Sequence, residues 1–168
     1  MKKFILALIT CSLLAVVCCQ DESALEKEKK AIIAVIEAEK VAYYHQDLAG
    51  LDASWVQEPS VRKIFLTTHG ITELSGWDEI HQNNIEAIER DWDEHPETAQ
   101  YSNYSINIYG NTALVYHDSE HKMTSPEELS ILNMRRIVHL VKLDDAWKID
   151  LMAMYFMPYN PMGEEIEM

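Results

Sequence analysis

The order of the local patterns along this sequence is the feature that most constrains its fold. Helical periodicity comes first, and the last third of the sequence is strand-like. Residues 104–109 alternate apolar and polar side chains, and the Gly110-Asn111 pair after them is typical of a tight hairpin. Asp144-Asp145 predicts a second tight turn near the C-terminus. The predicted strands are 60–68, 104–109, 113–123, 129–143 and 147–157. Because hairpins reverse the chain at each turn, these strands predict an antiparallel sheet.

Two helices are predicted ahead of the first strand. Apolar side chains between Leu25 and Tyr44 recur at three- and four-residue steps, which indicates an amphipathic helix, and Gly50 supplies a stop shortly afterwards. Residues 51–56 predict a second, short helix that Pro59 ends.

A third helix is predicted from Ser75, as its N-cap, to about Trp92. Helices followed by a run of antiparallel strands indicate the α+β class, in which the helices pack on one face of the sheet. We therefore expect a cone-shaped roll, with the N-terminal helices packed on the concave face of a curved antiparallel sheet. The open end of such a cone is a natural apolar pocket. The domain is predicted to span residues 25–158.

The N-terminus has the pattern of an export signal. Lys2 and Lys3 precede an apolar stretch over residues 4–17, which has the length of a signal-peptide core and is short for a membrane-spanning helix. The stretch ends in Cys18-Cys19, which resembles the lipobox of bacterial lipoproteins. We expect a lipoprotein signal peptide over residues 1–18 and lipidation of Cys19. Modification of Cys18 instead, and an ordinary secretory signal without lipid, are the alternatives.

This reading places the mature protein in the periplasm or cell envelope, held to the membrane only through its N-terminal lipid. Residues 19–24 are then a tether, and residues 159–168 an acidic tail. The three cysteines lie at positions 11, 18 and 19, so the domain itself has no disulfide, no cysteine nucleophile and no thiolate metal site.

The charge balance excludes one class of partner. The chain holds 14 Lys and Arg against 28 Asp and Glu, a formal net charge of −14. Binding to nucleic acid requires a basic surface that neutralises phosphates, and this chain has no such excess of cations. We therefore expect no nucleic-acid partner.

Four segments together resemble the nuclear transport factor 2-like superfamily, in its SnoaL-like branch. They are Tyr43-Tyr44-His45-Gln46-Asp47-Leu48, Ser75-Gly76-Trp77-Asp78-Glu79-Ile80, Arg135-Arg136-Ile137-Val138-His139-Leu140-Val141 and Asp144-Asp145-Ala146-Trp147-Lys148-Ile149. The resemblance implies a cup-shaped domain that hosts isomerases, dehydratases, epoxide hydrolases, cyclases and many non-catalytic binders. It also implies a homodimer through the outer face of the sheet. Fold alone does not choose among these activities.

The sequence offers few candidates for catalysis. The resemblance implies a carboxylate base on the strand after the first helices in isomerases, but residues 60–65 carry no acid, and Glu58 is only a distant substitute. His117 and His121 share a strand face about 13 Å apart, too far for one metal ion, so no metal site and no cofactor are expected. His81, with Asp78 three residues earlier on a helix, is the one candidate proton-transfer residue.

The remaining candidates are aromatic, basic or methionine side chains expected to line the pocket. An arginine in an apolar pocket suits a carboxylate, although Arg135 could equally pair with one of the chain's many acids. The predicted ligand-pocket residues are Tyr44, Trp55, Trp77, His81, Tyr116, Arg135, His139 and Met154. They predict a domain that binds a small apolar or carboxylate-bearing molecule. The alternative is a hydrolase or lyase of the same fold that uses a pocket histidine or carboxylate as general base.

Overall fold

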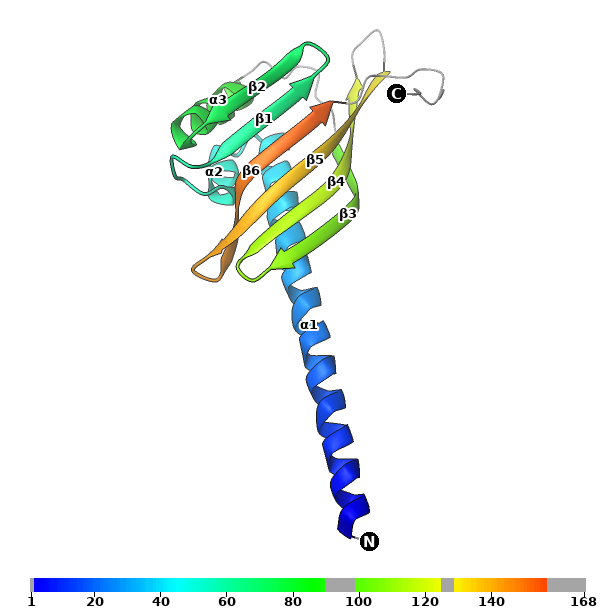
Figure 1. Cartoon of the computed structure of the whole chain (residues 1–168). Coiled ribbons are helices and arrows are strands. Elements are labelled where there is room, and N and C mark those ends of the chain that lie inside the picture. The colour runs from blue at the N-terminus through cyan, green and yellow to red at the C-terminus, as the bar shows by residue number, and fades with distance from the viewer. Residues whose placement is uncertain (1, 90–98, 125–128, 157–168) are drawn as a thin grey trace. The chain divides into compact units, whose positions relative to one another are not determined.

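Contacts within the chain separate residues 1–34 from residues 35–168, and helix α1 (Lys2–Tyr44) runs through the boundary. The computed structural model describes the backbone of residues 2–89, 99–124 and 129–156 and the side chains of residues 23–89, 99–121 and 132–156. Helices α2 and α3, the whole sheet and the part of α1 from Val35 onward belong to the second unit (Figure 1). The predicted helix end near Trp92 and the acidic tail over 159–168 lie outside the described residues.

Helix α1 contains the predicted signal segment and tether. Its backbone is helical through residues 19–24, and its side chains up to residue 22 lie outside the described part. No helix in the described part of the chain has an apolar stretch long enough to cross a membrane. Signal cleavage and lipidation of Cys19 remain predictions.

The connection between the first two helices differs from the sequence prediction. Helix α1 ends at Tyr44, and Gln46 adopts a left-handed conformation with φ 55°. Asp47 then caps helix α2 (Leu48–Ser54) by accepting a hydrogen bond from the Gly50 backbone N–H at 3.0 Å. Gly50 therefore lies inside α2 rather than at the end of α1. A Cβ there would approach an Asp47 side-chain oxygen to 2.5 Å, so the glycine permits this close turn.

Six strands form one sheet in the order β2-β1-β6-β5-β4-β3. The helices pack against this curved sheet, and α3 (Trp77–Glu89) precedes its four long strands. Ser75, predicted as the N-cap of this helix, is instead the last residue of β2, and its backbone N–H donates to the Glu79 carboxylate at 2.7 Å near the start of α3. The strands are β1 (Arg62–Thr67), β2 (Gly70–Ser75), β3 (Ala99–Tyr109), β4 (Thr112–Thr124), β5 (Leu129–Leu143) and β6 (Ala146–Phe156).

The predicted α+β class is confirmed, and the sheet is mixed rather than wholly antiparallel. Four neighbouring pairs are antiparallel, whereas β1 pairs with β6 in parallel. The sequence missed this because β1 and β6 are not joined by a hairpin, and no turn fixes their relative direction. It also missed β2, an edge strand whose side chains are almost all exposed and therefore show no apolar alternation.

Strand β3 starts five residues earlier than predicted. A register shift between Ser102 and Ser105 interrupts its pairing with β4, and Asn103 has φ 56°. Such a bulge breaks the two-residue alternation on which the sequence prediction depended. The remaining boundaries agree closely with the predicted strands.

The two faces of the sheet differ in burial. On β5 the buried side chains are Met134, Arg136, Val138 and Leu140, whereas Arg135 between them is exposed. On β4 the buried set runs from Ala113 through every second residue to His121. The buried sets define the inner face, which the C-terminal part of α1 contacts through a 2.6 Å hydrogen bond from Tyr104 to Glu37.

Candidate ligand-binding cavity

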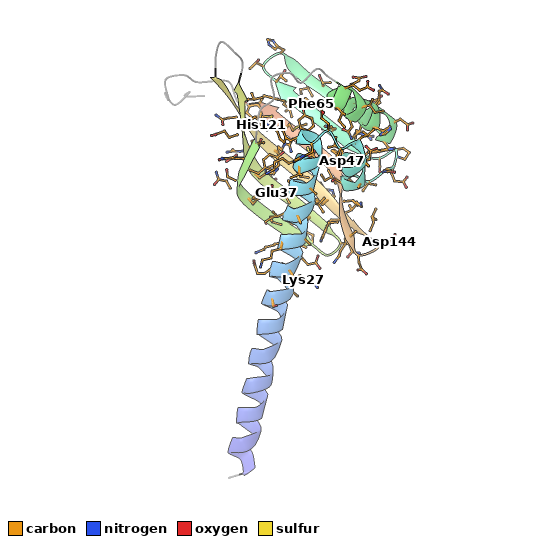
Figure 2. The ribbon with its side chains drawn as sticks, turned by 180° about the vertical axis from the view of Figure 1, so that it is seen from behind. Lys27, Glu37, Asp47, Phe65, His121 and Asp144 are labelled. Atoms are coloured by element: carbon orange, nitrogen blue, oxygen red, sulfur yellow. The ribbon has the colours of Figure 1, made fainter. Side chains whose placement is uncertain are left out.

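A cavity of about 350 Å³ lies between the inner face of the sheet, the end of α1 and one side of α3. Its volume is in the range of sites for small organic molecules. Figure 2 labels two of its lining side chains, Phe65 on β1 and His121 on β4. The apolar lining consists of Phe65, Ala87, Leu132, Met134, Met154 and Phe156. The polar lining consists of Glu39, Tyr43, Tyr44, Lys63, Asn83, Tyr101, His121 and Arg136.

Arg136 is the centre of the polar lining. It is only 7% exposed, and its Nη1 donates to Tyr101 Oη at 2.5 Å and to Glu39 Oε2 at 3.3 Å. Burial alone would lower the pKa of Arg136, but Tyr101 and Glu39 act against it and the net direction is upward. Burial also raises the pKa of Tyr101. The Glu39 carboxylate thus offsets one of the two cations in the cavity wall.

Lys63 is the second cation, and it has no such partner. It is 8% exposed, and its Nζ donates to Asn83 Oδ1 at 3.2 Å and Asn84 Oδ1 at 3.3 Å. No carboxylate among the described side chains lies within ion-pair distance of it. Burial lowers the pKa of Lys63 to about 8, an effect that Glu39 opposes and Arg136 reinforces.

A chain of polar groups connects Lys63 to the residue that the sequence proposed for catalysis. Asn84 Nδ2 donates to Asp52 Oδ1 at 3.4 Å, and Asp52 Oδ2 lies 2.9 Å from His81 Nδ1. The last two atoms are close but lack the alignment of a hydrogen bond. His81 is therefore behind the wall of the cavity, and its acidic neighbour is Asp52 rather than Asp78.

A tyrosine–histidine pair occupies another part of the wall. Tyr44 Oη lies 2.5 Å from His121 Nδ1. Burial raises the pKa of Tyr44 to about 12, while burial and then Arg136 lower the pKa of His121 to about 4. Both groups are neutral near pH 7, so either the Tyr44 hydroxyl donates to Nδ1 or a protonated Nδ1 donates to the hydroxyl oxygen, according to the tautomer of His121. The Nε2 of His121 is buried without a partner among the described residues.

His117 faces the same interior. Its ring stacks on Tyr104 at 5.0 Å between centroids and lies 4.7 Å from Tyr101. Burial, followed by Arg136, lowers the pKa of His117 to about 4. No group of three His, Cys, Asp or Glu side chains in the described part of the chain is arranged to hold a metal ion.

The structure brings only part of the predicted pocket together. Tyr44 and Met154 line the cavity. Trp55 is 2% exposed beneath Lys63, whose Nζ lies 6.0 Å from its ring centroid. Trp77 and His81 on α3 contact each other, with ring centroids 5.4 Å apart and planes tilted by 32°, and they do not line the cavity.

Tyr116, Arg135 and His139 lie on the outer face of the sheet and do not line the cavity. Arg135 Nε donates to Asp118 Oδ1 at 2.9 Å, and His139 Nδ1 lies 2.6 Å from Asp150 Oδ1. The reason is the two-residue period of a strand, which directs Arg136 inward and its neighbours outward. Arg135 pairs with an acid, the alternative that the sequence left open.

The sequence analysis missed Lys63, Arg136, Glu39, Tyr101 and His121. Two signals could have found some of them. Arg136 alternates with Met134 and Val138, which places it on the apolar face of β5. Glu39 interrupts the apolar stripe of a helix, and a carboxylate there requires a buried partner.

The fold is that of known NTF2-like proteins. A candidate scytalone dehydratase from Novosphingobium aromaticivorans matches with a TM-score of 0.67 and 16% identity, over 84% of this chain and 97% of that one. A candidate dehydratase of the NTF2-like family from Streptomyces avermitilis matches with a TM-score of 0.63 and 14% identity, over 80% and 99%. The described domain therefore has the NTF2-like α+β cone fold.

An NTF-2-like protein of unknown function from Shewanella oneidensis is also similar, with a TM-score of 0.58 and 17% identity over 76% of this chain and 98% of that one. No protein-family model and no curated protein matches the chain. Identities this low show a shared fold and leave the activity to be argued from the cavity.

Proposed function

We propose that this domain binds a small organic anion with an apolar body, such as a carboxylate, in the cavity. The lining joins six apolar side chains to two cations, Lys63 and Arg136, and to one carboxylate, Glu39. With Lys63 protonated, the wall carries one more positive than negative charge, although the chain as a whole is strongly acidic. A single anionic group on an apolar ligand balances that wall.

The unpaired ammonium of Lys63 is the observation that carries this proposal. Buried lysines are rare unless they are paired, because an uncompensated charge in a protein interior is costly. Lys63 has two amide oxygens as partners, which solvate its charge without neutralising it. A ligand carboxylate would supply the missing charge.

Calorimetry with matched ligands tests the proposal. We expect 3-phenylpropionate to bind and 3-phenylpropionamide, its neutral analogue, to bind much more weakly. Lys63→Met is expected to remove the preference for the anion, whereas Arg62→Met, one residue away on the outer face, keeps it. Equal affinity for the two ligands would refute the proposal. Native mass spectrometry of protein from its own source identifies the natural ligand.

A second candidate function is a lyase reaction at the same site. The Tyr44–His121 pair favours it, because it joins a phenol to an uncharged imidazole whose other nitrogen has no partner in the described part of the chain. Two proteins of the same fold are described as candidate dehydratases. The general base or acid would then be His121, not His81. Proton NMR of the copurified ligand incubated with the protein would show turnover, and His121→Gln should abolish it while binding persists.

We also propose that the chain is exported and carries a lipid on Cys19. The N-terminal pattern of positive residues, apolar stretch and terminal cysteines supports this. Mass determination of the mature N-terminus is the test. We expect a diacylglycerol-modified Cys19, lost in Cys19→Ser, and an unmodified terminus at residue 20 or later contradicts the proposal.

A homodimer through the outer face of the sheet is a further proposal. Tyr116 on β4 and Tyr155 on β6 are 38% and 49% exposed, so apolar rings are available on this face. Light scattering coupled to gel filtration should give a dimer, and Tyr155→Glu should give a monomer. A monomeric wild-type protein at high concentration contradicts the proposal.

A further inference from the structure

The amino group of Lys63 has features of a nucleophile as well as of a charge. It lies in the wall of the cavity, 5.7 Å from the Phe65 ring centroid and 6.0 Å from that of Trp55. The ring faces attract the cation, but the burial of Lys63 removes water that would stabilise its protonated form, and burial is the main cause that lowers its pKa. Lysines activated in this way react with carbonyl compounds.

The hydrogen bonds of Lys63 suit the neutral amine. An ammonium group has three N–H donors, whereas a neutral amine has two donors and one lone pair. The two oxygens of Asn83 and Asn84 accept two donors. Asn84 directs its oxygen to Lys63 because its amide nitrogen donates to Asp52. The remaining tetrahedral position of Nζ has no partner among the described residues and is free to hold the lone pair.

The groups around Lys63 point to the kind of carbonyl compound. Arg136 on β5 and Glu39 on α1 are the charged groups whose fields reach Lys63 across the cavity, Arg136 lowering and Glu39 raising the pKa of the lysine. Lys63 and Arg136 lie two strands apart, roughly 10 Å between backbones, and both side chains reach the same cavity. A ligand with a carboxylate near Arg136 can therefore present an adjacent carbonyl to Lys63.

We propose that Lys63 is a nucleophilic lysine that forms an imine with a small carbonyl compound in the cavity, and that 2-oxo acids with an apolar side chain are the class that fits best. The 2-oxo acid part rests on the proposed binding of organic anions. The lone pair of Nζ adds to the carbonyl carbon, and the π electrons move to oxygen. Both amine hydrogens then leave with that oxygen as water, and a C=N bond remains. No oxidation or reduction takes place.

Reductive trapping tests the proposal. The full chain is incubated with phenylpyruvate and sodium cyanoborohydride, and intact mass and peptide mapping follow. We expect a single adduct with the mass of phenylpyruvate less one oxygen, located on Lys63. At pH 7.5 a lysine with a pKa of about 8 is roughly a quarter neutral against ~0.1% for an ordinary one, so we expect labelling at least about tenfold faster than at exposed lysines.

Matched variants locate the reactive amine. Lys63→Arg keeps the positive charge without a nucleophilic amine, and it should lose the adduct. Lys63→Met is the second variant if the arginine alters folding. Lys148→Arg, the same change at a half-buried lysine on β6, should leave the adduct unchanged.

Phenylacetaldehyde, which lacks a carboxylate, separates this proposal from the binding of anions. Trapping of the aldehyde on Lys63 without trapping of phenylpyruvate supports the nucleophile and overturns the preference for 2-oxo acids. Binding of 3-phenylpropionate with no Lys63 adduct from either probe between pH 7 and 9.5 overturns the nucleophile and leaves the binding function intact. Labelling spread evenly over the lysines overturns it as well.

Discussion

Adjacent residues of strand β5 point to opposite faces of the sheet, and the two faces differ in burial and in the partners of their charged side chains. Arg136 faces inward, is 7% exposed and donates hydrogen bonds to Glu39 and Tyr101. Its neighbour Arg135 keeps 58% of its side chain exposed and pairs with Asp118. Arg62 and Lys63 on β1 repeat the contrast. Position on the sheet, rather than residue type, decides which of these cations belongs to the candidate site.

Arg136→Met has the largest expected effect. It leaves the Glu39 carboxylate buried without its cation and should lower the free energy of unfolding by about 3–5 kcal/mol. Arg135→Met, on the outer face, should change it by no more than about 0.5 kcal/mol, because exposed pairs contribute little. Urea denaturation measures both. Glu39→Leu added to Arg136→Met should recover much of the loss, and equal losses in the two single variants would break the contrast between the faces.

Lys63 gives the inner face a dependence on alkaline pH. Its pKa is lowered from 10.5 to about 8 in the folded protein. Between those values the unfolded chain binds more protons, so stability rises with pH and the penalty present below pH 8 is removed. From pH 7 to 9.5 the wild-type protein should gain about 2 kcal/mol relative to Lys63→Met. Denaturation curves at several pH values measure this gain, and an equal rise in the stability of Lys63→Met over the same range would contradict the assignment.

His121 gives the same face a dependence on acid. Its pKa is lowered from 6.5 to about 4, so the unfolded chain binds the extra proton between those values and stability falls as the pH drops. His121→Gln should reduce this loss between pH 7 and 4.5 by about 1.5 kcal/mol, a value that is reduced for solvent screening of the ring. His139→Gln is the matched change on the outer face. The prediction is contradicted if His139→Gln reduces the loss of stability between pH 7 and 4.5 more than His121→Gln does.

Tyr44→Phe has the smallest expected effect. It removes the hydrogen bond to His121 Nδ1 and should cost about 1 kcal/mol. Tyr116→Phe, on the outer face, should be close to neutral because that ring is 38% exposed. Thermal denaturation distinguishes the two, and a neutral Tyr44→Phe would show that the hydrogen bond to His121 does not stabilise the fold.

The sequence predicted the elements better than it predicted the site. Hairpin turns, periodicity and composition located the helices and five of the six strands, because these signals are local. The cavity depends on which face of each strand is buried, and a one-residue difference moved the chosen arginine from Arg136 to Arg135. The strand that holds Lys63 was set aside because residues 60–65 carry no acid, and the amide partners of Lys63 belong to another element, α3. Burial and partners of this kind are tertiary properties.

The parallel pairing of β1 with β6 has a consequence for how the cavity comes into being. Phe65 on β1 lies opposite Met154 on β6, the last strand, although α3 and three other long strands separate them in the sequence. The wall that holds Lys63 is therefore completed only after nearly the whole polypeptide has left the ribosome, and contacts between such distant segments slow folding. A nascent or truncated chain has no closed binding chamber, and its reactive amine stays an ordinary solvated lysine until the last strand docks.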